Sequence, residues 1–270
     1  MPTIEVRGYP YHYEQKGTGT PTWLFLHGFM GSHADFEAIN PRGTAIYLDL
    51  LGFGPNAPVV KDSHRFQAEQ QIADLQTLIQ NLTQQPVQLV GYSMGARLAL
   101  AYALAHPEDI QLLVLESGTP GLADADERQA RQLADEKKAH RVLESGMEAF
   151  INEWEQLPMF ASQQQLPATQ RAFMHAQRVA QQPENVAASL REFGTGAMPN
   201  LWPQLRALDV ATVLINGALD KKFLCITQNM LLHLPQAHDV QIPEAGHNVH
   251  FEAPMMFTQV LNDMQAMLYK

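Results

Sequence analysis

The stretch that decides the fold is Gly91-Tyr92-Ser93-Met94-Gly95, which follows the apolar run Val87–Val90 and precedes the helix-forming run Ala96–Ala105. A serine between two glycines at a strand-to-helix junction is typical of a nucleophile elbow, a sharp turn that presents the hydroxyl above a sheet. Larger side chains at Gly91 and Gly95 would collide with backbone in so tight a bend. Because the pentapeptide alone is common by chance, its meaning depends on partners further along the chain.

Short apolar runs alternate with helical segments over most of the chain. Thr3–Arg7 and Tyr11–Gln15, separated by Gly8-Tyr9-Pro10, predict an antiparallel hairpin at the start. The predicted buried strands are Thr22–Leu26, Ala45–Leu48, Val87–Val90, Leu112–Glu116, Ala211–Asn216 and Asp239–Ile242. Phe66–Leu82 has apolar residues at helical spacing, and Pro254–Leu268 reads as a closing helix. This alternation predicts an α/β fold, in which helices cover both faces of a mostly parallel sheet.

Residues 121–199 interrupt the alternation, because they are rich in Ala, Gln, Glu and Arg and contain no convincing strand. Pro120-Gly121 and Met198-Pro199 punctuate the two ends of this segment. We predict a helical cap of several short helices, inserted between two strands and lying over their carboxyl ends, where α/β sheets bind ligands. The predicted domains are therefore a core of residues 1–120 and 200–270 and a cap of residues 121–199.

Composition narrows the class of protein. With 270 residues, 46% hydrophobic and 17% charged, the chain resembles an ordinary globular enzyme. The net charge of −10 argues against nucleic acid or an anionic membrane as a partner. No apolar run is near the roughly 18 residues that span a bilayer, and Met1–Arg7 lacks the features of a signal peptide. Together with the single Cys225, these features predict a cytoplasmic protein, whose oligomeric state the sequence leaves open.

Two further residues can activate Ser93. A serine hydroxyl is a poor nucleophile or base until an imidazole takes its proton, and the imidazole needs an acceptor that fixes its tautomer. Asp220 follows the predicted strand Ala211–Asn216, and His247 follows Asp239–Ile242. Taken singly, Asp220 reads as a helix N-cap and His247 as one loop histidine among eleven. Because all three residues follow strand ends at one edge of the sheet, we predict a catalytic triad.

His27-Gly28-Phe29-Met30-Gly31 supplies a glycine-rich loop after another strand. We expect the backbone N–H groups of Phe29 and Met94 to form an oxyanion hole, since Met94 opens a helix whose first donors are unsatisfied. The histidine spacings match no metal-binding motif, so we expect neither a metal nor a cofactor.

Several segments carry a closer resemblance. In order, they are Gly91-Tyr92-Ser93-Met94-Gly95-Ala96-Arg97, Glu116-Ser117-Gly118-Thr119-Pro120-Gly121-Leu122, Trp154 with Pro158-Met159-Phe160-Ala161-Ser162, Asp220-Lys221-Lys222-Phe223 and Ala245-Gly246-His247-Asn248. The whole chain resembles the α/β-hydrolase superfamily. Within it, these segments resemble the 2-succinyl-6-hydroxy-2,4-cyclohexadiene-1-carboxylate synthases of menaquinone (vitamin K2) biosynthesis. The resemblance implies an α/β-hydrolase fold and a cofactor-independent lyase that eliminates pyruvate from 2-succinyl-5-enolpyruvyl-6-hydroxy-3-cyclohexene-1-carboxylate.

The resemblance also implies a pocket for a small tricarboxylate substrate. Its expected contacts are Arg97, Arg131 and Arg178 for the carboxylates, Tyr92 for the developing enolate, and Trp154 and Phe160 for the apolar faces of the ring. Arg128 and Arg131 cannot be separated by their spacing, and Trp154 and Phe160 also fit a purely structural role in the cap. Glu155 stands where some family members carry a second aromatic residue. If the substrate is a tricarboxylate, the three guanidinium groups should converge on the cavity that holds Ser93.

Two other functions share the same fold and residues. A serine carboxylesterase or C–C bond hydrolase would use Ser93 as a covalent nucleophile and form an acyl-enzyme. A non-catalytic binding protein would usually have lost part of the triad, which is intact here. The triad alone does not separate lyase from hydrolase. The arginines favour the lyase, because a neutral ester gains nothing from three guanidinium groups.

Overall fold

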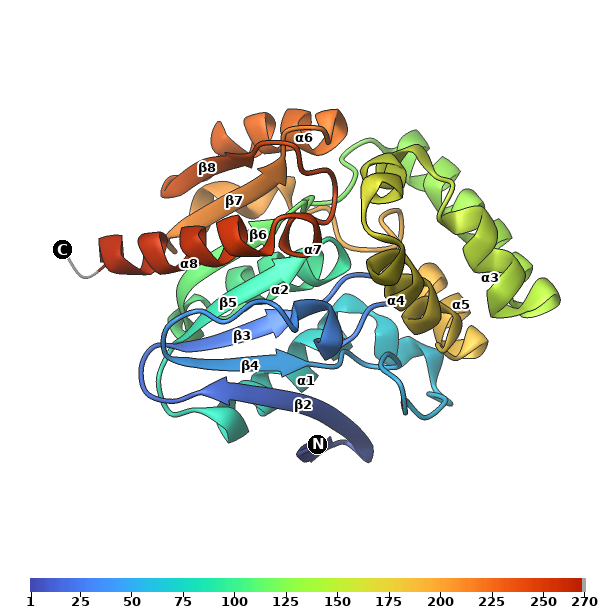
Figure 1. The fold of residues 1–270 in the computed structure, drawn as a ribbon, viewed down its shortest axis with the longest axis horizontal. Helices are drawn as coiled ribbons and strands as arrows, with labels where there is room; N and C mark the ends of the chain where they lie inside the picture. The colour runs from blue at the N-terminus through green and yellow to red at the C-terminus, as the bar shows by residue number, and fades with distance from the viewer. Residues whose placement is uncertain (269–270) are drawn as a thin grey trace.

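The centre of the protein is a mostly parallel sheet, seen in the computed structural model, which describes residues 1–268 (Figure 1). Within these residues eight strands lie in the order β1-β2-β4-β3-β5-β6-β7-β8. They are β1 (Thr3–Val6), β2 (Tyr9–Gly17), β3 (Thr22–Leu26), β4 (Thr44–Leu48), β5 (Val87–Tyr92), β6 (Ile110–Glu116), β7 (Thr212–Gly217) and β8 (Ala237–Ile242). The pairings from β4 through β8 are parallel, which confirms the predicted α/β class.

The entry hairpin forms, but its turn lies earlier than the sequence analysis placed it. Val6 pairs with Tyr9, so that Arg7 and Gly8 make the turn and Tyr9 and Pro10 already belong to β2. Arg7 and Gly8 have φ values of 51° and 75°. Two consecutive positive φ values are typical of the two-residue turns whose twist matches a hairpin. The prediction of a turn at Gly8-Tyr9-Pro10 is therefore wrong.

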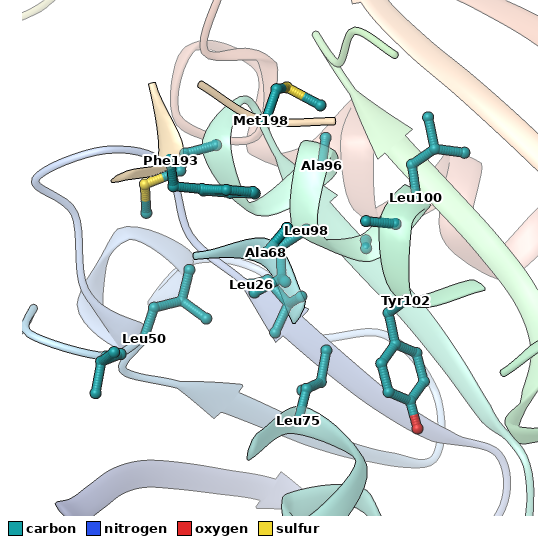
Figure 2. Close-up of a cluster of buried hydrophobic side chains, with 14 of the residues drawn as sticks. Leu26, Leu50, Ala68, Leu75, Ala96, Leu98, Leu100, Tyr102, Phe193 and Met198 are labelled. Carbon is teal, nitrogen blue, oxygen red and sulfur yellow. The ribbon is translucent and has the colours of Figure 1, made fainter. Parts of the chain in front are cut away.

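The side chains of the central strands alternate between two hydrophobic clusters, as expected for a sheet buried on both faces. Leu24 and Leu26 pack with α1 (Ala68–Leu82) and α2 (Met94–Ala105) on one face. Figure 2 shows part of this cluster, in which side chains of α2 meet those of β3, α1 and the end of the cap. Trp23 and Phe25 lie on the other face, which α8 (Pro254–Leu268) crosses in Figure 1.

Shorter elements complete the core, and a run of helices separates β6 from β7. The core elements are η1 (His33–Phe36), η2 (Ser63–Phe66), η3 (Pro107–Asp109), α6 (Lys221–Leu231) and α7 (Val249–Glu252). Between β6 and β7 lie α3 (Ala125–Trp154), η4 (Pro158–Gln165), α4 (Ala168–Val179), α5 (Pro183–Phe193) and η5 (Trp202–Ala207). In Figure 1 α3, α4 and α5 lie beyond the carboxyl ends of the parallel strands.

One helix of this segment departs from the expected set of short helices. α3 is 30 residues long, and Gly146 within it has a non-helical φ of 76°. The two halves therefore meet at a kink, which only a glycine adopts without strain.

The two ends of the helical segment meet at the edge of the core. The N–H of Leu201 donates to the carbonyl of Pro120 at 2.8 Å, and the indole Nε1 of Trp202 donates to the carbonyl of Gly121 at 2.9 Å. We call these four residues the neck. The neck supports the division into a core and a cap at residues 121 and 199, which stays a prediction. No helix in the described part of the chain is both long and apolar enough to cross a bilayer.

Candidate active site

Ser93 lies at the turn between β5 and α2, in a strained backbone conformation. Its φ and ψ are 50° and −101°, and its N–H donates to the carbonyl of Glu116 at 2.9 Å. A Cβ atom at Gly91 would lie 2.4 Å from the carbonyl oxygen of Gly95, and one at Gly95 would lie 2.1 Å from that of Leu26. Glycine is thus required at both positions, and the turn has the geometry of a nucleophile elbow.

His247 and Asp220 complete a hydrogen-bonded relay with Ser93. The Nε2 atom of His247 lies 3.0 Å from Ser93 Oγ, and its Nδ1 lies 2.7 Å from Asp220 Oδ2. In the tautomer that satisfies both bonds, Nδ1 donates to the carboxylate and Nε2 accepts from the hydroxyl. Asp220 is also the N-cap of α6, since its Oδ1 accepts from the N–H of Phe223 at 3.3 Å. The structural and the catalytic interpretations of Asp220 are therefore compatible.

Two chambers meet at Ser93, with cavity volumes of about 50 and 150 Å³. Ser93, Phe29 and Met159 line both of them. The smaller chamber is further lined by Tyr92, Trp154, Phe160, Arg178, Asp35 and His247, among others. The larger chamber is further lined by Met94, Arg97, Arg131, Lys222, Ser189 and Thr119, among others.

Arg97 lies one helical turn beyond Ser93 and faces the larger chamber. Its Nη1 donates to the carbonyl of Phe193 at 2.5 Å, and its guanidinium lies 4.8 Å from the centroid of the Phe193 ring. Among residues 1–268, no carboxylate lies within ion-pair distance of Arg97. Burial, together with the nearby charge of Arg131, lowers the pKa of Arg97 to about 9. It remains protonated at neutral pH, so the chamber wall holds a cation that has no direct ion-pair partner among residues 1–268.

Two more cations face the larger chamber. Of the two cap arginines that the sequence left unresolved, Arg131 lines it, and its Nε donates to Asp135 at 2.8 Å. Lys222 of α6 also lines it, and partial burial and Arg131 lower the pKa of its ammonium. The described lining of this chamber includes three cations and no carboxylate. Such mutual repulsion is relieved when an anion binds between the cations.

Arg178 lines the smaller chamber and is already paired. Its Nη1 donates to Glu155 at 2.7 Å, and its Nη2 donates to the amide oxygen of Gln163 at 3.2 Å. Glu155 in turn accepts from His175 Nδ1 at 2.9 Å. The expected convergence of three arginines on one cavity is therefore corrected: Ser93 faces both chambers, but Arg178 lies in a different chamber from Arg97 and Arg131.

Aromatic rings form the rest of the smaller chamber. Trp154 contacts both Phe29 and Phe160, with ring centroids 5.5 and 5.9 Å apart. Phe160 lies edge-on to the imidazole of His247 at 6.2 Å. Trp154 and Phe160 thus join the cap to the catalytic relay and face a cavity, which fits the expectation that they contact a ligand.

Tyr92 lies at the end of β5, against the imidazole of His247, with the ring centroids 5.5 Å apart. Burial raises the pKa of Tyr92 well above its ordinary value. The hydroxyl therefore remains protonated and can donate a hydrogen bond to a developing oxyanion.

The loop after β3 is fixed by His27, which is fully buried. The N–H of Leu50 donates to His27 Nε2 at 3.0 Å, and Nδ1 of the same ring lies 2.7 Å from the carbonyl oxygen of Gly28. Burial lowers the pKa of His27, which favours the neutral ring that this pattern needs. The loop carries Phe29 to the wall of both chambers. The use of the Phe29 and Met94 N–H groups as an oxyanion hole stays a prediction.

One group of side chains outside the site has the composition of a metal site. His106, Glu108 and Asp109 place potential ligand atoms within 4.8 Å of one another. Two of the three have other partners, since Tyr102 donates to Asp109 at 2.6 Å and Gln76 lies 3.2 Å from the imidazole of His106. The group carries no functional argument, and the expectation of a metal-free, cofactor-free site stays a prediction.

Comparison with known proteins places this geometry in a family. The model of the alpha/beta hydrolase fold matches residues 21–254. A Klebsiella pneumoniae 2-succinyl-6-hydroxy-2,4-cyclohexadiene-1-carboxylate synthase is 33% identical over 243 residues, 87% of this chain and 90% of that protein. A Bacillus subtilis protein named as a candidate for the same activity is 38% identical over 88% of each chain. The chain belongs to this synthase family.

A solved structure agrees with the assignment to the synthase family. The structure of MenH from S. aureus has a TM-score of 0.90 and 30% identity, with 96% of this chain and 99% of that chain covered. The predicted family resemblance is thereby confirmed.

Three residues that line the chambers have only weak local signals in the sequence. Lys222 stands out in the sequence only within the family segment Asp220-Lys221-Lys222-Phe223, and its position in the first turn of α6 is the signal that identifies it. Asp35 lies in the wall of the smaller chamber, and burial raises the pKa of its carboxyl. Met159 lines both chambers from η4, whose sequence gives no sign of it.

Proposed function

We propose that the protein eliminates pyruvate from 2-succinyl-5-enolpyruvyl-6-hydroxy-3-cyclohexene-1-carboxylate and releases 2-succinyl-6-hydroxy-2,4-cyclohexadiene-1-carboxylate. Membership in the synthase family supports this reaction. The observation that carries it to this site is the larger chamber, where Ser93 shares a wall with Arg97, Arg131 and Lys222. A trianionic substrate brings negative charge to Arg97, which has no ion-pair partner among residues 1–268, and to Arg131 and Lys222 beside it.

The reaction is a proton abstraction followed by loss of a leaving group. The names of substrate and product show that the ring loses the hydrogen on C2 and the oxygen on C5, while the double bond moves from C3–C4 to become a 2,4-diene. The C2–H is acidic because the succinyl carbonyl is attached to C2. Removal of this proton places negative charge on the carbonyl oxygen, which an oxyanion hole and the Tyr92 hydroxyl can stabilise.

The relay moves the protons in a closed cycle. Ser93 gives its proton to His247 Nε2 and takes the C2 proton of the substrate, so it acts as a base and forms no acyl-enzyme. Asp220 stabilises the imidazolium that results. The enolpyruvate leaves with the C5–O electron pair, receives the proton from His247, and tautomerises to pyruvate. No redox partner and no water are consumed.

The charges of the two chambers suggest how the substrate lies. The carboxylates are drawn to the larger chamber, since no acid lies among its described lining residues. The smaller chamber offers aromatic rings and Arg178. Glu155 is paired with the Arg178 guanidinium, and Asp35 lies in the wall of the same chamber. A carboxylate that enters it competes with Glu155 for Arg178.

The test is pyruvate release from the purified enzyme and its proposed substrate, followed by a coupled lactate dehydrogenase assay. Ser93→Ala should lower the rate by at least about 10³-fold, because the relay residues act as a unit. Ser145→Ala, at a half-buried position of α3 that lines neither chamber, is the matched control and should leave the rate unchanged. Rapid hydrolysis of a small neutral ester without any pyruvate release would favour the carboxylesterase instead.

A further inference from the structure

A second histidine–carboxylate pair lies buried beside the relay. Glu116 is the last residue of β6, and His250 lies in α7, three residues after His247. Glu116 Oε2 accepts from His250 Nδ1 at 2.7 Å, and Oε1 accepts from the backbone N–H of His250 at 3.0 Å. Both side chains are 0% exposed. Removing two such groups from water is costly, so their contacts need a physical account.

Glu116 holds both loops that carry the reacting atoms. Its backbone carbonyl accepts the N–H of Ser93 at 2.9 Å, at the strained residue of the elbow. Its carboxylate holds the backbone and the ring of His250, which continue from the loop of His247. A single residue therefore connects the turn that presents Ser93 Oγ with the segment that presents His247 Nε2.

The imidazole of His250 extends this connection to Tyr92. The two rings meet edge-on, with centroids 4.8 Å apart and an interplanar angle of 71°. Phe36 lies against the His250 ring at 4.3 Å, and His250 Nε2 is buried without a hydrogen-bond partner among the described residues. The only side-chain hydrogen bond that orients the ring in residues 1–268 is therefore the bond to Glu116.

We propose that Glu116 and His250 are positioning residues that set the separation of Ser93 Oγ and His247 Nε2 and the orientation of Tyr92. The inference rests on the proposed function only in taking Ser93 and His247 as the reacting pair. Proton transfer depends steeply on donor–acceptor geometry, and a displacement of about 1 Å costs roughly 10²-fold in rate. Neither residue is among the described lining of the two chambers, so their effect falls on turnover more than on substrate binding.

The first variant is Glu116→Gln, which keeps the shape of the side chain but replaces one of the two acceptors by a donor. Two rates are measured: pyruvate release, and phosphonylation of Ser93 by a fluorophosphonate, which needs only the relay. Both should fall together by about 10- to 100-fold, while KM changes less than about threefold. If the wild-type enzyme releases no pyruvate but the variant is still phosphonylated slowly, the proposed function fails and this inference stands.

A pair of variants at position 250 tests the geometry of the bond itself. The amide nitrogen of an asparagine lies near the position of His250 Nδ1, whereas that of a glutamine lies near Nε2. His250→Asn should therefore keep phosphonylation within about fivefold of the wild type, and His250→Gln should behave like Glu116→Gln. The exposed His238→Gln is the control.

Two outcomes would overturn the inference. One is a folded Glu116→Gln protein, judged by circular dichroism, that is phosphonylated at the wild-type rate. The other is equal behaviour of His250→Asn and His250→Gln, which decides the question even if Glu116→Gln does not fold.

Discussion

Replacing Arg97 with methionine should make the protein more stable and less active at the same time. The guanidinium is half-buried in the wall of the larger chamber, bonded to a backbone carbonyl, and without a carboxylate within ion-pair distance among residues 1–268. The difference between its ordinary pKa of 12.5 and the value of about 9 corresponds to about 5 kcal/mol of unfavourable desolvation and repulsion by Arg131. Losing the hydrogen bond to Phe193 and the contact with its ring offsets roughly 2–4 kcal/mol of this. The net gain in unfolding free energy is then about 1–3 kcal/mol, or a rise in Tm of roughly 2–9 °C.

The same substitution should weaken catalysis selectively. Removing one member of a desolvated charge pair costs about 3–5 kcal/mol, so kcat/KM for the trianionic substrate should fall by at least about 10²-fold. Hydrolysis of a small neutral ester at Ser93, where it is measurable, should change less than about threefold. The assays are a thermal melt, the coupled pyruvate assay and an ester assay on one preparation. The exposed Arg206→Met serves as the control for loss of a positive charge.

The opposite result would give Arg97 a purely structural role. If Arg97→Met lowers Tm and reduces both activities by the same factor, the guanidinium is a structural support for Phe193 and the cap. The main support for carboxylate binding in the larger chamber would then be gone.

Three further changes test other parts of the site. Glu155→Gln removes the carboxylate that pairs with Arg178, so KM for the trianionic substrate should fall by about 3- to 10-fold. The control Glu153→Gln, which breaks the exposed pair with Arg141, should leave KM unchanged. Equal effects of the two variants would contradict the competition between Glu155 and a substrate carboxylate for Arg178. Gly28→Ala places a Cβ 2.6 Å from Cε1 of Tyr92, so the tyrosine ring must shift against His247. We expect kcat to fall by about 10- to 100-fold. An unchanged kcat would show that the position of the Tyr92 ring does not affect the reaction. The hydrogen bond to Glu155 raises the pKa of His175 above 6.5, so the stabilisation by this pair is complete below pH 6.5 and is lost as the pH rises through the raised pKa. Thermal melts of His175→Gln as a function of pH should lack this loss. Identical pH profiles of Tm for the variant and the wild type would contradict the prediction.

The parts of the fold that follow from local signals were predictable from the sequence. The elbow is specified by Gly91 and Gly95, which leave no room for any other residue, and the strands that precede Ser93, Asp220 and His247 are short apolar runs. Because parallel strands end at one edge of a sheet, the relay could be inferred from order alone. Its individual roles remain predictions.

The remaining features of the fold and the site depend on long-range packing and could not be predicted from the sequence. The hairpin turn was predicted too late in the chain because arginine rarely has a positive φ, so that Arg7 gives no turn signal, whereas Pro10 is typical of turns. α3 was expected as shorter helices, since nothing in the sequence says that a helix continues on the far side of Gly146. The pairing of Arg178 with Glu155 joins residues 23 positions apart through the packing of α3 against α4. Such a contact determines which chamber the arginine lines, and it cannot be predicted from the spacing of residues along the sequence.

The neck bears on how this protein can change over evolutionary time. Because Pro120 and Leu201 are hydrogen-bonded neighbours, the chain leaves the core and returns to it at nearly the same point. A segment whose ends coincide can be lengthened or exchanged in part without altering the register of any strand. Ser93, Asp220 and His247, together with Arg97 and Lys222 of the larger chamber, belong to the part that stays fixed, whereas Trp154, Phe160, Arg131 and Arg178 belong to the part that can change. The hydrogen-bonded relay is therefore inherited apart from much of the pocket wall that surrounds it, so that wall can vary while the relay is kept.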